Sequence, residues 1–164
     1  MSKRLNLREF QQNLIDRLQV TELPDSRASV LAVLIAERNW LVDMADIAEV
    51  LPLPYLAVVP LTKSWFLGVA NVRGNLYGVT DLAAYEKAGA ASGNATNCVL
   101  LVSERFAFNA ALLVDRVLGL RDTQNWKKNE VYGQVEYLDE TGASWVKLDV
   151  QGLLQQAEFL QIGI

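Results

Sequence analysis

The chain has 164 residues, 51% of them hydrophobic and only 21% charged, so it is too apolar to be disordered and suits one domain or two small joined lobes. A net charge of −4 and a pI near 4.9 argue against binding to nucleic acid, which relies on clustered Lys and Arg. The sequence contains no histidine, and so lacks the usual general base and the commonest zinc ligand. We therefore expect no catalysis, no metal and no cofactor.

Three further features bear on compartment and partners. The single cysteine, Cys98, opens the apolar run 98–102 and is expected to be a buried hydrophobe, not a reactive thiol. The longest apolar run, residues 30–36, is far short of the roughly 20 residues that span a bilayer, and no secretory signal is evident. We expect a soluble, cytoplasmic protein, with Lys127-Lys128 in a solvated loop.

The first 25 residues are predicted to form a helical extension. Apolar residues recur there at helical spacing, and Asn6 and Glu9 suit an N-cap and its capping-box partner. The apolar positions are Leu7, Phe10, Leu14 and Leu18. We expect this amphipathic helix to pack on its own domain, with docking onto a partner as the alternative.

Strands are expected from residue 30 onward. Residues 30–35 are almost continuously apolar, and residues 40–42 follow after a turn, which indicates a hairpin. Residues 44–50 suggest a short helical or irregular turn before 51–53. The next connection should be extended because it carries Pro52, Pro54 and Pro60.

The most informative stretch is residues 71–82. Gly74-Asn75 is a permitted two-residue hairpin loop, flanked on both sides by apolar residues. Arg73 then lies beside the corner of the hairpin and points outward. An arginine on a rigid hairpin, with no catalytic base nearby in sequence, suits recognition of another surface.

The chain has the marks of an internal repeat. Residues 88–97 are small and polar, which is typical of a connection between two halves. Features of the first half recur 68 or 69 residues later, although such matches are too few to establish duplication alone. The matched pairs are Val30 with Val99, Asp46 with Asp115, Gly74 with Gly142, Tyr77 with Trp145, and Asp81 with Asp149. Two small antiparallel lobes, each curled into a barrel, account for this spacing, and residues 153–160 suggest a closing helix.

The central motif resembles that of the CheW-like family, which couples chemosensory receptors to the CheA histidine kinase. The matching residues are Gly68, Asn71, Val72, Arg73, Gly74, Leu76, Val79, Asp81 and Leu82. Supporting blocks are Met44, Ile47, Glu49 and Val50, then Leu113-Val114-Asp115 with Val117, and finally Leu148-Asp149. Gly78 departs from the family's usual proline, and residues 125–141 match poorly. The sequence around the motif is most similar to members from type IV pilus chemosensory systems.

The resemblance implies a mainly β fold of two SH3-like, five-stranded barrel lobes. It places the family domain at residues 28–164, with a first lobe at about 40–95 and a second at about 98–150, and with exchange of the terminal strands left open. It also implies two partners for a non-enzymatic adaptor. These are the regulatory domain of a CheA-like kinase and the cytoplasmic tip of a methyl-accepting chemoreceptor, with twitching motility as the expected output and no insertion into membranes.

The resemblance also assigns roles to residues. Partner contacts are expected from Arg73, Asn71, Val72, Glu49, Val50 and Leu51. Structural roles are expected for Gly68, Gly74, Asp81, Leu82 and Asp115.

Several alternatives stay open. Arg73 has the alternative of pairing with a carboxylate of its own lobe such as Asp81, and Asp81 and Asp149 are expected to cap helical turns. The acidic residues Asp43, Asp46 and Glu49 are expected to form a solvated face. The alternative function is a small β-barrel that binds a ligand or hydrolyses it with carboxylates alone, which requires a deep polar pocket.

Overall fold

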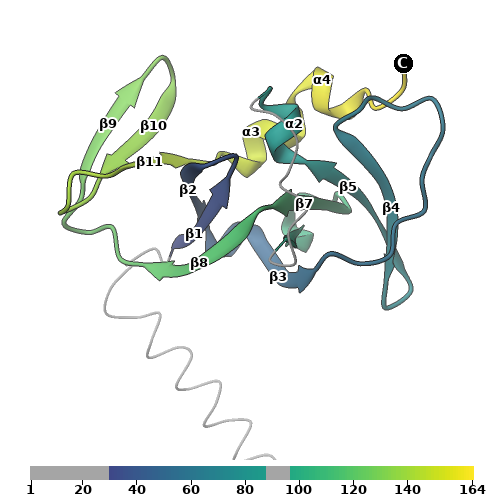
Figure 1. Cartoon of the computed structure of the whole chain (residues 1–164), viewed down its shortest axis with the longest axis horizontal. Helices are drawn as coiled ribbons and strands as arrows, with labels where there is room; N and C mark the ends of the chain where they lie inside the picture. Colours follow the sequence, from purple (N-terminus) through teal and green to yellow (C-terminus); the bar gives the residue numbers. More distant parts are fainter. Residues whose placement is uncertain (1–29, 88–96) are drawn as a thin grey trace, which may run out of the picture.

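The computed structural model describes residues 30–87 and 97–164, and these form a mainly β fold with short helices (Figure 1). The predicted N-terminal helix and most of the predicted connection at 88–97 lie outside the described residues. The strands are β1 (Val30–Ile35), β2 (Arg38–Asp43), β3 (Ile47–Pro52), β4 (Phe66–Val72), β5 (Asn75–Asp81), β6 (Cys98–Val102), β7 (Ala110–Val114), β8 (Arg116–Arg121), β9 (Lys127–Val131), β10 (Gln134–Leu138) and β11 (Ser144–Lys147). The helices are η1 (Met44–Asp46), α2 (Leu82–Tyr85), η2 (Glu104–Phe106), α3 (Val150–Gln155) and α4 (Ala157–Leu160).

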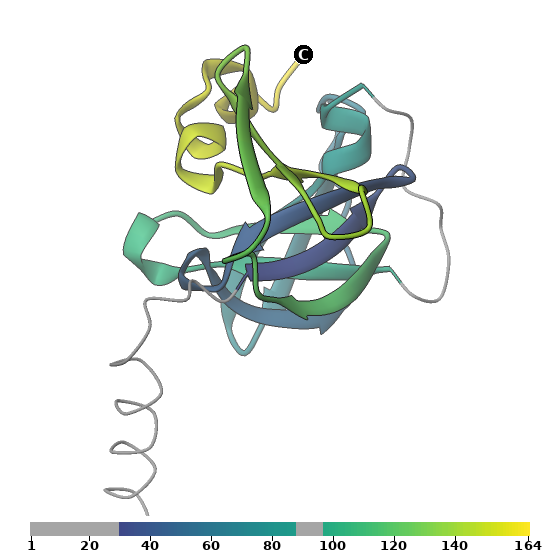
Figure 2. The same ribbon diagram turned by 90° about the vertical axis from the view of Figure 1, so that its left-hand side faces the viewer.

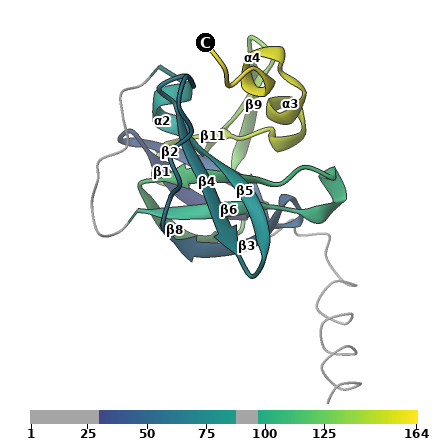
Figure 3. The same cartoon turned by 90° about the vertical axis from the view of Figure 1, so that its right-hand side faces the viewer.

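The strands form two sheets that lie side by side (Figure 1). Sheet A has the order β8-β1-β2-β11-β10-β9, and sheet B has the order β3-β6-β7-β5-β4. Each sheet contains one parallel pair, β2 with β11 in sheet A and β7 with β5 in sheet B, while the other pairs are antiparallel. Figure 2 looks onto the side of sheet A, and Figure 3 onto the side of sheet B.

The repeat seen in the sequence appears in the pairing. The order β3-β6-β7-β5-β4 of sheet B corresponds strand for strand to β8-β1-β2-β11-β10 of sheet A, and β9 is an addition. Each repeat gives its first two strands to one sheet and its later strands to the other. The two sheets therefore do not correspond to the two halves of the chain before and after residues 88–97. β1 and β2 pair with strands of the second repeat, and β6 and β7 pair with strands of the first repeat.

Three apolar clusters bury the strands that have continuous apolar runs in the sequence. The largest cluster, called the central core below, lies between the sheets and the C-terminal helices. It includes Leu31, Val33, Leu100, Leu112 and Phe159. The second lies on the other face of sheet B and includes Val79, Val99, Leu101, Ala111 and Leu113. The third lies on the other face of sheet A and includes Val30, Ala32, Leu41 and Trp145. Strands β1, β6 and β7 are covered on both faces, so they lose the usual polar alternation.

The hairpin of the central motif is placed one residue earlier than the sequence predicted. Val72 pairs with Asn75, so the two loop residues are Arg73 and Gly74, with φ of 51° and 84°. Two positive φ values match the right-handed twist of the flanking strands in a two-residue hairpin. Asn75 was wrongly predicted as a loop residue because asparagine also favours this backbone region.

The other local predictions were partly right. Helices α2 and α3 begin at the predicted caps: Asp81 accepts a hydrogen bond from the Ala84 amide, and Asp149 accepts one from the Gly152 amide. The expected irregular turn ends early, because β3 already begins at residue 47. Lys127-Lys128 is not in a loop but opens the exposed strand β9, where lysines suit an unpaired sheet edge. None of the described helices is long and apolar enough to cross a membrane.

Gly78 keeps strand β5 regular despite replacing the family's proline. It pairs with Val69 on one side and Ala110 on the other, and its amide donates to the Asn109 carbonyl over 3.1 Å. A proline there would lose this hydrogen bond. A Cβ on Gly78 would also approach the Phe66 ring to 3.0 Å. The departure from the family pattern therefore leaves the strand in register.

Candidate partner-binding site

Arg73 occupies the first corner position of the β4–β5 hairpin. A left-handed backbone is unfavourable for a residue with a side chain, by roughly 1–2 kcal/mol. The neighbouring Asn71 offsets part of this cost, because its Oδ1 accepts a hydrogen bond from the Gly74 amide over 2.9 Å. The hairpin thus holds its corner by a side-chain bond as well as by strand pairing.

Glu49 of β3 holds the guanidinium of Arg73 in a bidentate ion pair. Nη1 donates to Oε2 over 2.7 Å, and Nη2 donates to Oε1. This hydrogen bonding lowers the pKa of Glu49 and raises the pKa of Arg73, so both groups are charged. Arg73 thus pairs with a carboxylate of its own lobe, as the alternative expectation held, but that carboxylate is Glu49, while Asp81 caps α2.

This ion pair links two elements from opposite sides of sheet B. β3 is one edge of sheet B, and the β4–β5 hairpin forms the other edge. The hairpin tip lies beside β3 in Figure 3. The ion pair of Glu49 and Arg73 therefore links the edge strand β3 to the tip of this hairpin through side chains. The remaining edge strand of sheet B, β4, is covered by Ala57, whose backbone exchanges hydrogen bonds of 2.8 and 2.9 Å with Val69.

The apolar residues predicted at this site divide between two faces. Leu51 and Val72 are half-buried and pack against the cluster on the Glu49 face of sheet B. Val50 pairs with Leu100, which belongs to the central core, and so points to the opposite face with 39% of its surface exposed. The structure therefore brings together Arg73, Asn71, Glu49, Leu51 and Val72, and it separates Val50 from them.

The residues predicted as structural have identifiable roles. Gly68 has φ of 138°, and a Cβ there would lie 2.4 Å from the Ala57 carbonyl oxygen. Leu82 is fully buried in the central core. Asp115 is buried, and its Oδ2 accepts a hydrogen bond from the Ala36 amide over 2.7 Å, at the turn between β1 and β2.

The acidic residues near η1 do not form the solvated face that we expected. Asp46 is buried and pairs with Arg105, while Asp43 pairs with Lys147 over 2.8 Å. Burial raises the pKa of Asp46, against the opposing effect of the Arg105 charge. The expectation was wrong because the counter-ions come from residues about 60 and 100 positions away in sequence. Among the described residues no group of three or more possible metal ligands is found.

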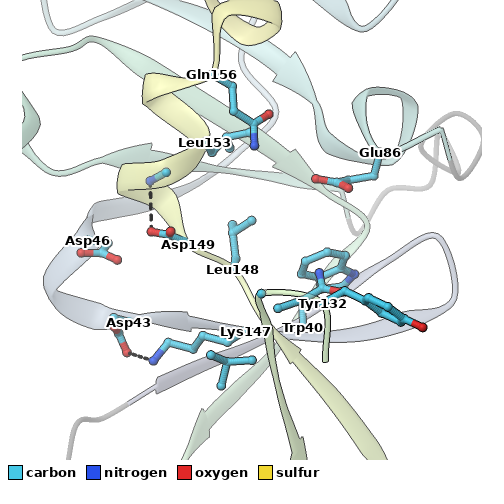
Figure 4. Close-up of a pocket in the computed structure, with 14 residues that line it drawn as sticks. Trp40, Asp43, Asp46, Glu86, Tyr132, Lys147, Leu148, Asp149, Leu153 and Gln156 are labelled. Atoms are coloured by element: carbon cyan, nitrogen blue, oxygen red, sulfur yellow. Dashed lines mark hydrogen bonds and ion pairs between the residues drawn. The ribbon is translucent and has the colours of Figure 1, made fainter. Parts of the chain in front are cut away.

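Sequence reasoning missed a polar cleft of about 590 Å³ between the β9–β10 hairpin and α3 (Figure 4). Its lining includes the carboxylates of Asp43, Asp46, Glu86 and Asp149, with the ammonium of Lys147. Burial raises the pKa of Glu86, partly offset by the charge of Arg38. No motif signals the cleft, because its walls come from segments spread between residues 40 and 156.

The fold and the motif agree with a family of known proteins. The model of the CheW-like domain matches residues 29–158, so this chain belongs to the CheW-like family. Over 84 residues it is 34% identical to Protein PilI of Pseudomonas aeruginosa, which covers 51% of this chain and 47% of that protein. The chain thus spans about half the length of the curated relative that it matches.

A solved structure gives independent support for the fold. The crystal structure of the scaffolding protein TtCheW from Thermoanaerobacter tengcongensis matches with a TM-score of 0.67 at 17% identity, covering 79% of this chain and 94% of that one. The predicted family and the predicted mainly β fold with two sheets are confirmed.

Proposed function

We propose that this chain is a non-enzymatic adaptor that couples chemoreceptors to a CheA-like histidine kinase. The observation that carries the proposal is the match to the CheW-like family over residues 29–158. The similarity to PilI favours a chemosensory system that controls type IV pili and twitching motility. On this proposal the protein acts in the cytoplasm, where the kinase regulatory domain and the receptor tips are found.

The proposed contact surface is the part of sheet B where Glu49 of β3 meets the tip of the β4–β5 hairpin. Arg73 has 69% of its side chain exposed at a corner that is fixed by Asn71 and Glu49. Apolar surface from Leu51 and Val72 lies next to it. A rigid arginine beside apolar surface is a common centre of binding energy at protein interfaces. Val50, on the other face, is proposed to contact a different part of the partner.

The test is binding of the Arg73→Glu variant to a CheA-like kinase and to a chemoreceptor cytoplasmic fragment from the same organism. We expect a loss of about 2 kcal/mol or more with at least one partner, as for a central interface arginine. The matched control is Arg38→Glu, because Arg38 also forms an exposed ion pair, with Glu136 at 3.3 Å. Unchanged affinity of Arg73→Glu for both partners would remove the hairpin from the interface.

The alternative function, a ligand-binding or hydrolytic barrel, has the polar cleft in its favour but lacks a pair of available acids. Asp43 and Asp46 are occupied by ion pairs, and Asp149 caps α3. Among the described lining carboxylates, Glu86 alone forms no hydrogen bond or ion pair through its side chain. Acid–base hydrolysis by carboxylates needs two groups with different pKa values. The adaptor is therefore the better-supported function.

A further inference from the structure

Strand β9 is an exposed edge of sheet A. Among the described residues its only strand neighbour is β10, and its residues 127–130 are all exposed. In Figure 1 the β9–β10 hairpin stands out from the body of the molecule, with β9 on its outer side. An edge strand of this kind offers backbone N–H and C=O groups to another strand.

The geometry of the hairpin identifies which backbone groups of β9 face outward. Val131 pairs with Gln134 across a two-residue loop, 132–133, in which both residues have positive φ, of 51° and 77°. In such a hairpin the residues that flank the loop form a hydrogen-bonded pair, and bonded and non-bonded pairs then alternate along the strands. The amides and carbonyls of Lys128 and Glu130 therefore point away from β10, toward the free edge.

These two outward-facing residues carry opposite charges. Lys128 and Glu130 lie two positions apart, so their side chains are on the same face of the strand. Their neighbours across β10 are Tyr137 and Val135, which are uncharged. Neither Lys128 nor Glu130 forms an ion pair with any described residue. Both charges are thus available to a strand that pairs with the free edge.

The sequence of β9 is complementary to itself when two copies run antiparallel. If Asn129 lies opposite Asn129 of a second copy, Lys128 of each copy lies opposite Glu130 of the other. These are the same positions whose backbone groups face outward, so one register satisfies both the backbone and the charges. Shifting the two strands by two residues in either direction would place like charges opposite each other.

The same register brings aromatic residues together at each end. Tyr132 is fully exposed at the hairpin tip, and it would lie opposite the half-buried Trp126 of the second copy. Lysines at a sheet edge oppose pairing with most strands, but here each lysine meets a carboxylate. Alternate residues along this strip therefore read aromatic, basic, acidic and aromatic, in the order Trp126, Lys128, Glu130 and Tyr132.

We propose that β9 pairs with β9 of a second copy of this chain, antiparallel and across a two-fold axis at Asn129, so that the two copies of sheet A become one continuous sheet. Each Lys128–Glu130 pair then exchanges both backbone hydrogen bonds as well as a side-chain ion pair. The contact is smaller than the ~1,200 Å² of most stable complexes, so we expect a Kd between about 10 and 1,000 μM. The dimer uses sheet A and leaves the Arg73 surface of sheet B free, so it does not depend on the proposed adaptor function.

Charge reversal tests the register. Lys128→Glu and Glu130→Lys each place like charges opposite each other in a homodimer, so sedimentation equilibrium should show a Kd about tenfold or more weaker for each variant. A mixture of the two variants has opposite charges at both pairs, so it should form a heterodimer about as tightly as the wild type. Loss in each variant without recovery in the mixture overturns the proposal, as does a wild-type chain that stays monomeric up to about 1 mM.

Lys127→Glu is the matched control, because it makes the same change in net charge one position away. Its side chain lies on the other face of β9 and would be opposite the uncharged Val131 of the second copy. At about 0.15 M salt, which screens distant charges, we expect a Kd within about twofold of the wild type. A loss as large as that of Lys128→Glu would show that net charge and not the register governs self-association, which overturns the proposal.

Hydrogen exchange measures the pairing without any substitution. At low protein concentration the Lys128 and Glu130 amides should exchange rapidly, whereas the Asn129 and Val131 amides are bonded to β10. Raising the concentration through the Kd should slow exchange at Lys128 and Glu130 in proportion to the fraction of dimer. Unchanged exchange at these two amides in a dimeric sample would place the interface on another face of the molecule and refute pairing through β9.

Discussion

At the scale of single residues, two glycines with positive φ differ in what surrounds them. A Cβ on Gly68 would meet the Ala57 carbonyl oxygen at 2.4 Å, whereas a Cβ on Gly133 would have no atom within 4 Å. Both positions have left-handed φ, of 138° and 77°. An alanine at position 68 would therefore suffer both steric clash and backbone strain, whereas an alanine at position 133 would suffer backbone strain alone.

We predict that Gly68→Ala lowers the free energy of unfolding by about 3 kcal/mol or more, against about 1 kcal/mol for Gly133→Ala. Urea denaturation of both variants measures the difference. The reason is that Ala57 covers the edge of β4 through two backbone hydrogen bonds, which the added methyl would force apart. Equal losses in the two variants would contradict a close approach at Gly68.

The buried carboxylate of Asp46 gives a second prediction at this scale. Arg105→Met leaves the carboxylate without its counter-ion and should lower stability at pH 7 by about 1–3 kcal/mol. Because burial raises the pKa of Asp46 in the folded state, the folded protein takes up the proton first as pH falls. The loss should therefore shrink as the pH falls through the raised pKa and be smallest below 3.8.

The measurement is the difference in unfolding free energy between wild type and Arg105→Met at pH 7 and at lower pH. The double variant Asp46→Asn with Arg105→Met is the control, because no carboxylate remains to be neutralised. The same loss at every pH would show that Arg105 stabilises the protein by packing and not by its charge.

At the scale of elements, the two sheets carry different kinds of side-chain contact between their strands and connections. In sheet B the ion pair of Glu49 and Arg73 links β3 to the β4–β5 hairpin. In sheet A the ring of Trp126 instead packs against Trp145 at 5.5 Å between centroids. The repeated backbone plan therefore carries a polar contact in one sheet and an aromatic contact in the other.

The turn between β10 and β11 depends on one half-buried carboxylate, that of Asp139. Asp139 accepts hydrogen bonds from the Thr141 and Ala143 amides, the Thr141 hydroxyl and the Trp145 indole. These bonds, led by the Thr141 and Trp145 side chains, lower the pKa of Asp139 to about 2. The charged form is thus the one that holds the turn.

We predict that the Asp139 carboxyl titrates in the folded protein near pH 2, as measured by NMR. Asp139→Ala should lower the Tm at pH 7. Because the folded pKa is depressed, this contribution is present above the ordinary value of 3.8 and is lost as pH falls through about 2. A titration midpoint near 3.8 would show that the four hydrogen bonds do not favour the ionised form.

At the scale of the whole molecule, the exchange of strands ties the two sheets into one unit. β1 and β2 lie in sheet A, while the next three strands of the same repeat lie in sheet B. The central core also takes residues from both sheets, for example Val33 from β1 and Leu112 from β7. Neither sheet can be completed by a continuous half of the chain.

We therefore predict that the described part of the chain unfolds as a single cooperative unit. Native-state hydrogen exchange should give the same opening free energy for the slowest amides of β1 and β2 as for those of β6 and β7. The exposed β9 strand, at the edge of sheet A, is expected to exchange faster and serves as the internal comparison. A distinctly lower value for either buried pair would contradict unfolding as one unit.

The sequence by itself determined the local features. The continuous apolar runs in β1, β6 and β7, the capping roles of Asp81 and Asp149, and the presence of a tight hairpin at Gly74 follow from propensities that act over a few residues. The family also followed from the sequence, because its motif lies within residues 68–82.

Only the tertiary structure decided which distant residues meet. The partner of Arg73 is 24 positions away and that of Asp46 is 59 positions away, and the strands of each sheet come from both repeats. An arginine has the same local preferences whichever carboxylate it faces. Pairing between distant strands is selected by burial of both faces at once, so Glu49 became a partner of Arg73 only through the arrangement of β3 and the β4–β5 hairpin in sheet B.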